Sequence, residues 1–282
     1  MLPSSINEIK RCMYIPIKKI RQFFMPEFVC SPQGWVHKPK SAGWNDKSIA
    51  KAQKARWESI VNSLQGSGPL TTAYTYISPE LTKNDLAAQN TIMSYAYILA
   101  LTARKRGTIS LLDWGGGVGL YRLLSKILFP EMNIEYYCYD TPMLCSLGRE
   151  LLSDGIFFED AEAALSRRYD LVLSSSSLHY CERWQEVFAQ LAKAAIRYLY
   201  IARLPVVQNV GSFVEVQKCY QNKIYGYNTE FTSWVIDRRE LLKIARQSGM
   251  NIIREFLYGE TRFIHKAPEN PEVRGFLFGS KR

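Results

Sequence analysis

A glycine-rich stretch in the middle of the chain strongly limits what this sequence can fold into. The sequence LLDWGGGVG, residues 111–119, runs from an apolar strand-like segment directly into a helix-like segment. Glycines leave the backbone bare, so a ligand can approach it closely. A loop that opens a helix also favours an anionic group, because the helix N-terminus carries partial positive charge. The stretch therefore predicts a ligand-binding turn at the carboxyl end of a strand in an α/β sheet.

The rest of the chain from residue 109 onward agrees with an α/β sheet. Short apolar runs alternate with helical stretches, which is typical of a mostly parallel sheet covered by helices on both faces. The predicted strands are 109–113, 134–139, 156–158, 169–174 and 197–202, with a terminal pair at 252–258 and 274–278. The predicted helices among them are 120–128, 143–152, 182–194 and 238–247.

The region before this sheet is predicted to be a basic, mainly helical N-terminal extension, residues 1–68, followed by the main domain, residues 69–282. Residues 1–40 carry half of the chain's net charge of +10. Ile17, Ile20 and Phe24 fall on one face of a short basic helix, which we expect to pack on the main domain. Contact of this helix with an anionic membrane surface is the open alternative. Two longer helices are expected, at about 47–64 and 84–104.

The lack of a visible targeting signal and the spacing of the cysteines predict a reducing compartment. The chain shows no secretory signal and no apolar segment long enough to span a bilayer. None of the six cysteines forms a CxxC pair, so we expect reduced thiols and no metal site. The predicted location is the cytoplasm, with peripheral contact at the inner face of the membrane as the alternative.

An aromatic-rich insertion is predicted at residues 204–237, between a strand and the helix that follows it. Its aromatic residues are Phe213, Tyr220, Tyr225, Tyr227, Phe231 and Trp234. Long ordered insertions often cover an active site. We therefore expect this segment to border the ligand.

Two cofactor classes compete for the glycine loop. A dinucleotide fold requires G-x-G-x-x-G, but counting from Gly115 the third glycine is replaced by Leu120. The loop instead reads D-x-G-x-G-x-G, with Asp113, Gly115, Gly117 and Gly119. This pattern resembles motif I of the class I S-adenosylmethionine (SAM)-dependent methyltransferases.

The resemblance implies a Rossmann-like methyltransferase sheet, mostly parallel with its last strand reversed, and SAM as cofactor. It implies that Asp140, at the end of the second strand, binds the ribose of the cofactor. It implies an adenine-side acid at Glu159–Asp160, of which Asp160 is favoured, although Asp160 also suits a helix cap. The YDLVLSSSSLHY segment is similar to the family's motif IV, which implies that Ser174 lies beside the cofactor.

A narrower resemblance involves DWGGGVGLY, SSSLHY and the Arg203-Leu204-Pro205 turn. Together with the upstream GWNDKSIAKAQKARW and NTIMSYAYILA segments, they look similar to a methyltransferase family associated with bacterial surface-polysaccharide synthesis. This resemblance implies a glycan, or another small-molecule acceptor, as the partner.

Methylation of a hydroxyl group benefits from a general base. His179 closely follows the fourth predicted strand and is the candidate base, with a hydrogen bond to a loop carbonyl as its structural alternative. Tyr180 is expected to bind substrate. Arg203 is expected to bind a carboxylate or phosphate of the acceptor through paired donors, with a salt bridge at the sheet edge as its alternative.

The leading hypothesis is O-methylation of a sugar hydroxyl on a surface glycan or its precursor. The alternatives are a non-catalytic SAM-fold module that scaffolds a glycan-assembly complex, and an NAD-dependent oxidoreductase. The missing third glycine disfavours the oxidoreductase. Nucleic acid is not an expected partner, because the chain shows no RNA- or DNA-binding motif.

Overall fold

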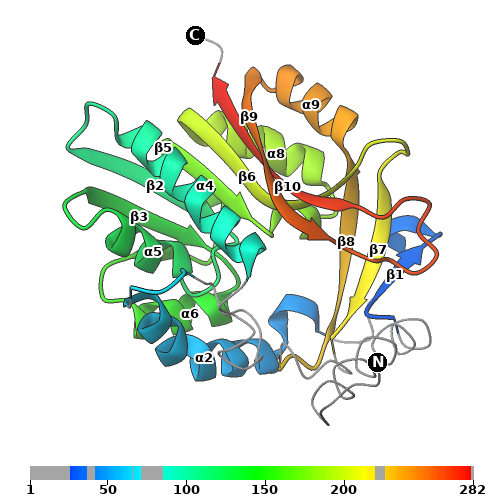
Figure 1. Ribbon diagram of the computed structural model, residues 1–282, viewed down its shortest axis with the longest axis horizontal. Coiled ribbons are helices and arrows are strands. Elements are labelled where there is room, and N and C mark those ends of the chain that lie inside the picture. Colours follow the sequence, from blue (N-terminus) through cyan, green and yellow to red (C-terminus); the bar gives the residue numbers. More distant parts are fainter. Residues whose placement is uncertain (1–25, 37–41, 66, 71–84, 220–225, 281–282) are drawn as a thin grey trace, which may run out of the picture.

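The computed structural model describes residues 26–36, 42–65, 67–70, 85–219 and 226–280. Most of these residues form one α/β unit (Figure 1). Its strands are β1 (Phe28–Ser31), β2 (Thr108–Trp114), β3 (Asn133–Tyr139), β4 (Ile156–Phe158), β5 (Tyr169–Ser175), β6 (Ala195–Val207), β7 (Phe213–Lys218), β8 (Glu230–Asp237), β9 (Met250–Thr261) and β10 (Glu272–Ser280). Its helices are α2 (Lys47–Gln65), α4 (Leu86–Ala103), α5 (Leu120–Leu128), α6 (Pro142–Leu151), α7 (Ala161–Leu165), α8 (Trp184–Ala194) and α9 (Arg238–Gln247), with short 3-10 turns η2 (Gly43–Asn45) and η3 (Leu178–Tyr180).

The central sheet has the order β4-β3-β2-β5-β6 and is parallel throughout this part. β10 then runs antiparallel to both of its neighbours, β6 and β9. Among β2 to β6, β9 and β10, the strand that runs against the others is therefore β10, the last in the sequence. This order confirms the predicted Rossmann-like sheet with a reversed last strand.

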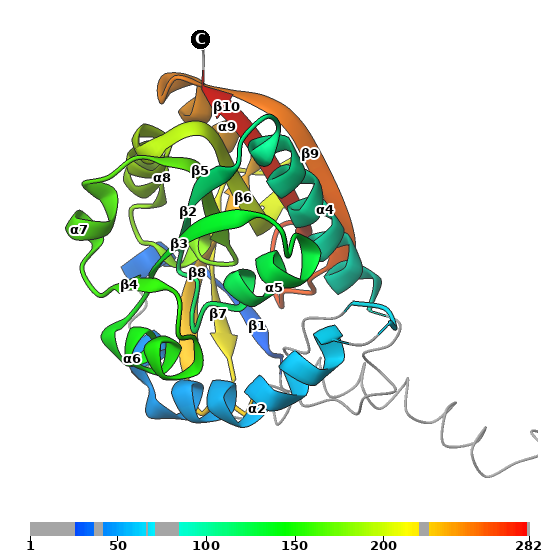
Figure 2. The ribbon, with the colours of Figure 1, turned by 90° about the vertical axis from the view of Figure 1, so that its left-hand side faces the viewer.

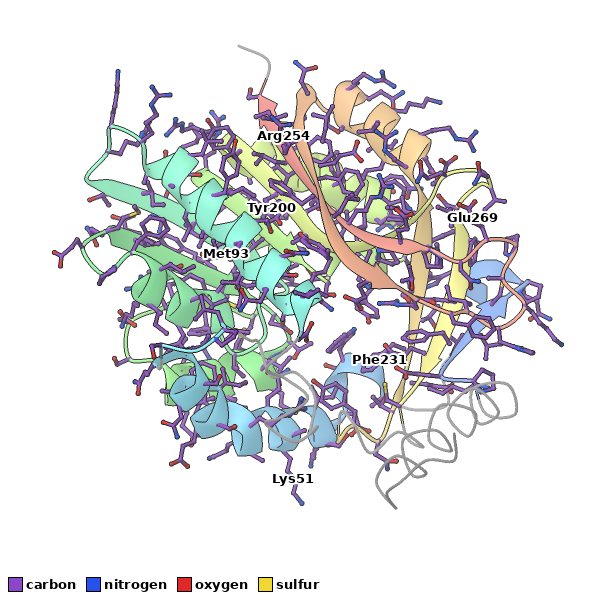
Figure 3. The ribbon with its side chains drawn as sticks, viewed as in Figure 1. Lys51, Met93, Tyr200, Phe231, Arg254 and Glu269 are labelled. Atoms are coloured by element: carbon purple, nitrogen blue, oxygen red, sulfur yellow. The ribbon has the colours of Figure 1, made fainter. Side chains whose placement is uncertain are left out.

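Helices cover both faces of this sheet (Figure 2). α4 and α5 pack on one face, where Tyr95 and Ile98 of α4 are fully buried. α8 and α9 pack on the other face, where Trp184 and Phe188 of α8 are fully buried. Because both faces are covered, the middle strands are apolar runs rather than alternating patterns. Figure 3 shows the contrast between Tyr200, buried beneath α4, and Met93, which points outward from that helix.

The segment 204–237 is not a loop laid over the sheet but an extension of it. The strand predicted at 197–202 continues to Val207, because its second half pairs with β10 on one side and β8 on the other. β7 and β8 form an antiparallel pair, and β1 adds to the outer edge of β7. Tyr220 and Tyr225 lie outside the described residues.

The described part of the N-terminal region also joins this architecture. β1 pairs with β7, and α2 packs against both α5 and α6: Ile60 and Leu64 share a core cluster with α5, and Ile49 shares one with α6. Ile17, Ile20 and Phe24 lie outside the described residues. Within the described ranges, no helix combines the length and apolar character needed to cross a membrane.

Candidate functional site

The glycine loop connects β2 to α5 with a backbone that only glycine adopts easily. Gly115, Gly117 and Gly119 have φ angles of +70°, +62° and +89°. Side chains are strained in this left-handed region. The loop is anchored to the neighbouring strand, because the Gly115 N–H donates to the Tyr139 carbonyl at 2.8 Å. The alternation of glycines that the sequence showed is therefore a backbone requirement.

Gly116 is required for a different reason, which is space. A Cβ added at Gly116 would lie 2.5 Å from Cγ of Asp113 and 2.8 Å from Sγ of Cys138. The loop thus lies directly on the Asp113 carboxyl, which is fully buried. One carboxyl oxygen of Asp113 accepts a 2.6 Å hydrogen bond from the Tyr136 hydroxyl. The other, Oδ1, is buried and has no hydrogen-bond partner among the described residues.

Burial shifts the ionisation of both acids near the loop. The pKa of Asp113 is raised to about 7, mainly by desolvation, with the Tyr136 hydrogen bond opposing and nearby Asp140 adding to the shift. Burial also raises the pKa of Asp140. The Asp140 carboxylate accepts hydrogen bonds from the backbone N–H groups of Gly117, at 2.8 Å, and Thr141, at 2.7 Å. These two bonds lower the pKa and oppose part of the burial effect.

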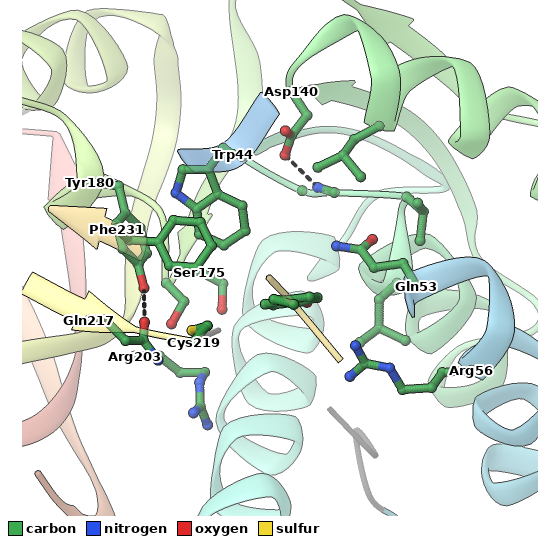
Figure 4. Close-up of a pocket in the computed structure, with 18 of the residues that line it drawn as sticks. Trp44, Gln53, Arg56, Asp140, Ser175, Tyr180, Arg203, Gln217, Cys219 and Phe231 are labelled. Atoms are coloured by element: carbon green, nitrogen blue, oxygen red, sulfur yellow. Dashed lines mark hydrogen bonds between the residues drawn. The ribbon is translucent and has the colours of Figure 1, made fainter. Parts of the chain in front are cut away.

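A cavity of about 370 Å³ opens beside the loop (Figure 4). That volume is in the range of small-molecule sites. The predicted site residues that line it are Asp113, Gly115, Gly117, Asp140, Tyr180 and Arg203.

The remaining predicted site residues do not line the cavity. Gly119 begins α5, where a Cβ would lie 2.5 Å from Leu152. Asp160 caps α7, since its carboxylate accepts from the Ala163 N–H at 2.8 Å. Ser174 is buried and hydrogen-bonded to Ser177 at 2.7 Å. The helix-cap alternative stated for Asp160 therefore matches its observed contacts.

His179, the candidate base, is fully buried in η3 and does not line the cavity. Neither ring nitrogen has a hydrogen-bond partner among the described residues. Burial lowers the pKa of His179 well below its usual value, and the positive charges of Arg262 and Arg203 lower it further. Its ring lies against that of Tyr180, with centroids 4.3 Å apart. In this position His179 lies against Tyr180, which lines the cavity, and its own side chain does not reach the cavity lining.

Part of the cavity wall is built by Trp44 and Arg56, which the sequence did not predict as site residues. The rings of Trp44, Tyr180 and Phe231 contact one another, with centroids 5.0 Å apart for Trp44 and Tyr180, 4.4 Å for Trp44 and Phe231, and 5.8 Å for Tyr180 and Phe231. Arg56 is buried and lies over the ring of Tyr227, 5.4 Å from its centroid. Figure 4 shows the Arg56 side chain directed into the cavity. The aromatic content of 204–237 was a partial signal for this wall, which Tyr227 and Phe231 do line.

Charged residues on β6, on β9 and just after β9 also line the cavity. Nη2 of Arg203 lies 3.1 Å from Oε2 of Glu260, and both residues line the cavity. Arg262 lines it as well and pairs with Glu215 at 2.6 Å behind the wall. The Tyr180 hydroxyl donates to Gln217 at 3.3 Å, and burial raises the pKa of this phenol.

The residues that the structure describes contain no candidate metal site. No group of three or more His, Cys, Asp or Glu residues in those ranges is placed to hold a metal ion.

No protein-family model matches this sequence, and no curated protein matches it either. Similar solved structures include magnesium protoporphyrin IX methyltransferase from Synechocystis PCC 6803 with bound SAM, 18% identical over 86% of this chain and 100% of that one, with a TM-score of 0.49. A SAM-dependent methyltransferase from Clostridium acetobutylicum ATCC 824 is 10% identical, over 69% of this chain and 92% of that one, with a TM-score of 0.46. The 1,6-didemethyltoxoflavin-N1-methyltransferase of Burkholderia thailandensis is 11% identical, over 86% and 94%, with a TM-score of 0.43. The order and direction of the strands, and not these distant similarities, carry the fold assignment.

Proposed function

We propose that this chain is a SAM-dependent methyltransferase that methylates a hydroxyl oxygen. The observation that carries the proposal is the Asp140 carboxylate, joined to the glycine loop by the Gly117 N–H and directed to a cavity of ligand size. A carboxylate in this position accepts hydrogen bonds from paired hydroxyl groups such as those of a ribose.

The residues at this end of the cavity fit such a cofactor. A Cβ at Gly117 would meet no atom closer than Gln53, at 3.4 Å, so the loop faces the cavity and not packed protein. The buried Oδ1 of Asp113 accepts no hydrogen bond from any described residue, and Asp113 lines the cavity. Gly115, Gly117 and Asp140 would hold the cofactor. When bound, SAM supplies a methyl group already activated by the sulfonium.

The chain's own contribution is then to bind, orient and dehydrate the acceptor. The aromatic rings of Trp44, Tyr180 and Phe231 contact one another and line the cavity. Arg203 and Glu260 add donors and acceptors to the cavity lining.

For the acceptor we propose a sugar hydroxyl of a surface glycan or its precursor. Flat aromatic rings beside planar polar side chains suit a polyhydroxylated ring, whose faces are apolar and whose edges donate and accept hydrogen bonds. The resemblance of the DWGGGVGLY, SSSLHY and RLP segments to the polysaccharide-associated family supports the same acceptor. An acidic or phosphate-bearing sugar would also use Arg203. Contact with the membrane would involve the basic residues before residue 26, outside the described ranges.

Titration calorimetry with SAM, its demethylated product and NAD tests the cofactor. Binding of the first two without NAD is the expected result, and absence of SAM binding at millimolar ligand would reject the proposal. Mass spectrometry of surface glycans from cells with and without the protein tests the acceptor. A methyl group that disappears with the protein supports methylation, whereas a loss of the whole glycan without a methyl difference would favour a scaffolding role.

A further inference from the structure

Two irregularities in neighbouring strands border the same short stretch of β10. In β6, Ala202 and Arg203 together lie opposite Gly275, because the register shifts between the pairs Ile201–Phe276 and Leu204–Arg274. In β9, Tyr258 and Gly259 are extra residues between the pairs Leu257–Arg274 and Glu260–Val273. Bulges of this kind redirect side chains and are common next to active sites.

The bulge in β6 is fixed by specific packing. Gly275 leaves space for the Tyr258 hydroxyl, which lies 2.2 Å from where a Cβ would stand. The Tyr258 hydroxyl is 2.5 Å from that of Tyr200 and is hydrogen-bonded to the Arg203 backbone. Arg203 itself has a φ of +52°, which is strained for a residue with a side chain. Residues held in such conformations cluster at functional sites.

The two bulges bring Arg203 and Glu260 together on the cavity wall. Oε2 of Glu260 is buried and lies 3.1 Å from Nη2 of Arg203, too poorly aligned for a hydrogen bond. It accepts no hydrogen bond from any described residue. A carboxylate oxygen with this unused capacity is able to accept one from a hydroxyl group that enters the cavity.

Other candidate bases are less suitable. His179 does not line the cavity, and Glu215 is fully buried and paired with Arg262. The raised pKa of Tyr180 keeps its phenol protonated. Among the described residues the cavity is lined by four acids: Glu27, Asp113, Asp140 and Glu260. Asp113 and Asp140 lie at the glycine loop, and Glu27 accepts a hydrogen bond from the Gln217 side chain at 2.8 Å.

We propose that Glu260 is the general base for the acceptor hydroxyl and that Arg203 positions its carboxylate. The inference rests on the proposed methyltransferase function. As the hydroxyl oxygen forms its bond to the methyl carbon and the carbon–sulfur bond breaks, the hydroxyl proton passes to Glu260. The cofactor leaves as a neutral thioether, and Glu260 then releases the proton to solvent.

The test uses tritiated SAM and an envelope extract from cells of the source organism that lack this protein, which accumulate the unmethylated acceptor. Because general-base catalysis contributes about 100-fold or more, Glu260→Gln is expected to lower kcat by at least about 100-fold while leaving the apparent KM for the extract within about threefold. Glu260→Asp, which keeps the carboxylate, should recover part of the rate. Cofactor affinity, measured by calorimetry, should be unchanged in both variants.

The matched control is Glu272→Gln, which removes an ion-paired carboxylate of the same hairpin outside the cavity. It should retain wild-type turnover. Wild-type turnover in Glu260→Gln would overturn the proposal, and so would loss of turnover in Glu27→Gln with Glu260→Gln active. If the wild-type protein binds no SAM, or binds it and methylates nothing in the extract, the proposed function fails instead.

The role of Arg203 has its own test. Arg203→Gly removes the side chain and also the backbone strain, so the melting temperature should not fall although kcat does. Arg203→Lys should recover part of kcat, because a cation beside Glu260 is restored. A fall in melting temperature for Arg203→Gly, with turnover retained, would show that the residue serves the fold and not Glu260.

Discussion

The backbone N–H of Gly117 donates a 2.8 Å hydrogen bond to the carboxylate of Asp140, joining the glycine loop after β2 to the end of β3. The two features that most clearly resembled a SAM site in the sequence are thus one structural unit. The acid holds the loop in shape, and the loop holds the acid at the cavity.

Asp140→Ala is expected to weaken SAM binding about 10- to 100-fold, since hydrogen bonds to charged groups contribute about 1.5–3 kcal/mol. Calorimetry measures the affinity. Asp160→Asn is the comparison, because Asp160 caps α7 and does not line the cavity. If Asp160→Asn weakened binding as much as Asp140→Ala, the adenine-side role inferred from sequence would hold and the described cavity would be incomplete.

Gly116→Ala is expected to lower the free energy of unfolding by about 1–3 kcal/mol and to abolish cofactor binding. The added methyl group would lie 2.5 Å from the Asp113 carboxyl, so the loop must move. Denaturant unfolding and calorimetry measure the two effects. Gly107→Ala is the control, because a Cβ there meets nothing within 4 Å. Unchanged stability in Gly116→Ala would contradict the close packing of the loop on Asp113.

His179 is expected to make the free energy of unfolding decrease as the pH falls. Its pKa in the folded protein lies well below the ordinary 6.5, so below pH 6.5 the unfolded chain binds a proton that the folded protein does not. The free energy of unfolding therefore falls as the pH drops below 6.5, by up to about 1.4 kcal/mol per pH unit from this group. Denaturant unfolding of the wild type and His179→Leu between pH 7.5 and 5 isolates the contribution. Identical slopes would mean that His179 is protonated while folded, and hence accessible.

Gly275→Ala is expected to lower turnover, although Gly275 does not line the cavity. The new methyl group would collide with the Tyr258 hydroxyl, which is bonded to the Arg203 backbone. We expect a loss of about 1–3 kcal/mol of stability and a fall in kcat, with cofactor affinity retained. Gly211→Ala, where a Cβ meets nothing within 4 Å, is the control. Normal turnover in Gly275→Ala would show that the bulge does not affect the reaction.

The part of the cavity at the glycine loop was predictable because its signals are local. Asp113 lies near the end of β2, the alternating glycines follow that strand, and Asp140 directly follows β3, so the strand order of a parallel sheet brings them together. The strand and helix pattern was readable for the same reason, with 120–128 and 238–247 matching α5 and α9 residue for residue.

The part of the cavity around Arg56, Arg203 and Glu260 was not predictable in the same way, because segments far apart in the sequence meet there. Arg56 comes from α2 and Glu260 from β9, and no spacing in the sequence relates them. The bulges that place Arg203 and Glu260 on the cavity wall depend on the register in which β10 pairs with β6 and β9. In the sequence, Gly259 and Gly275 are signals of these bulges, but they do not reveal the register. His179 was favoured by its distance from a strand end, which does not reveal that the side chain turns inward.

The placement of β1 has a consequence for how the protein is made. Phe28 lies at the cavity, and its strand is held between β7 and the His265 backbone, which accepts from the Cys30 N–H at 3.0 Å. On the ribosome, the strands that carry Asp113 and Asp140 emerge and can pair early, whereas Phe28 must wait for residues near 265 before its strand is secured on both sides. A chain stalled before β9 would thus carry the glycine loop and the rings of Trp44, Tyr180 and Phe231, but it would lack Glu260 and the contact that secures Phe28 on its second side.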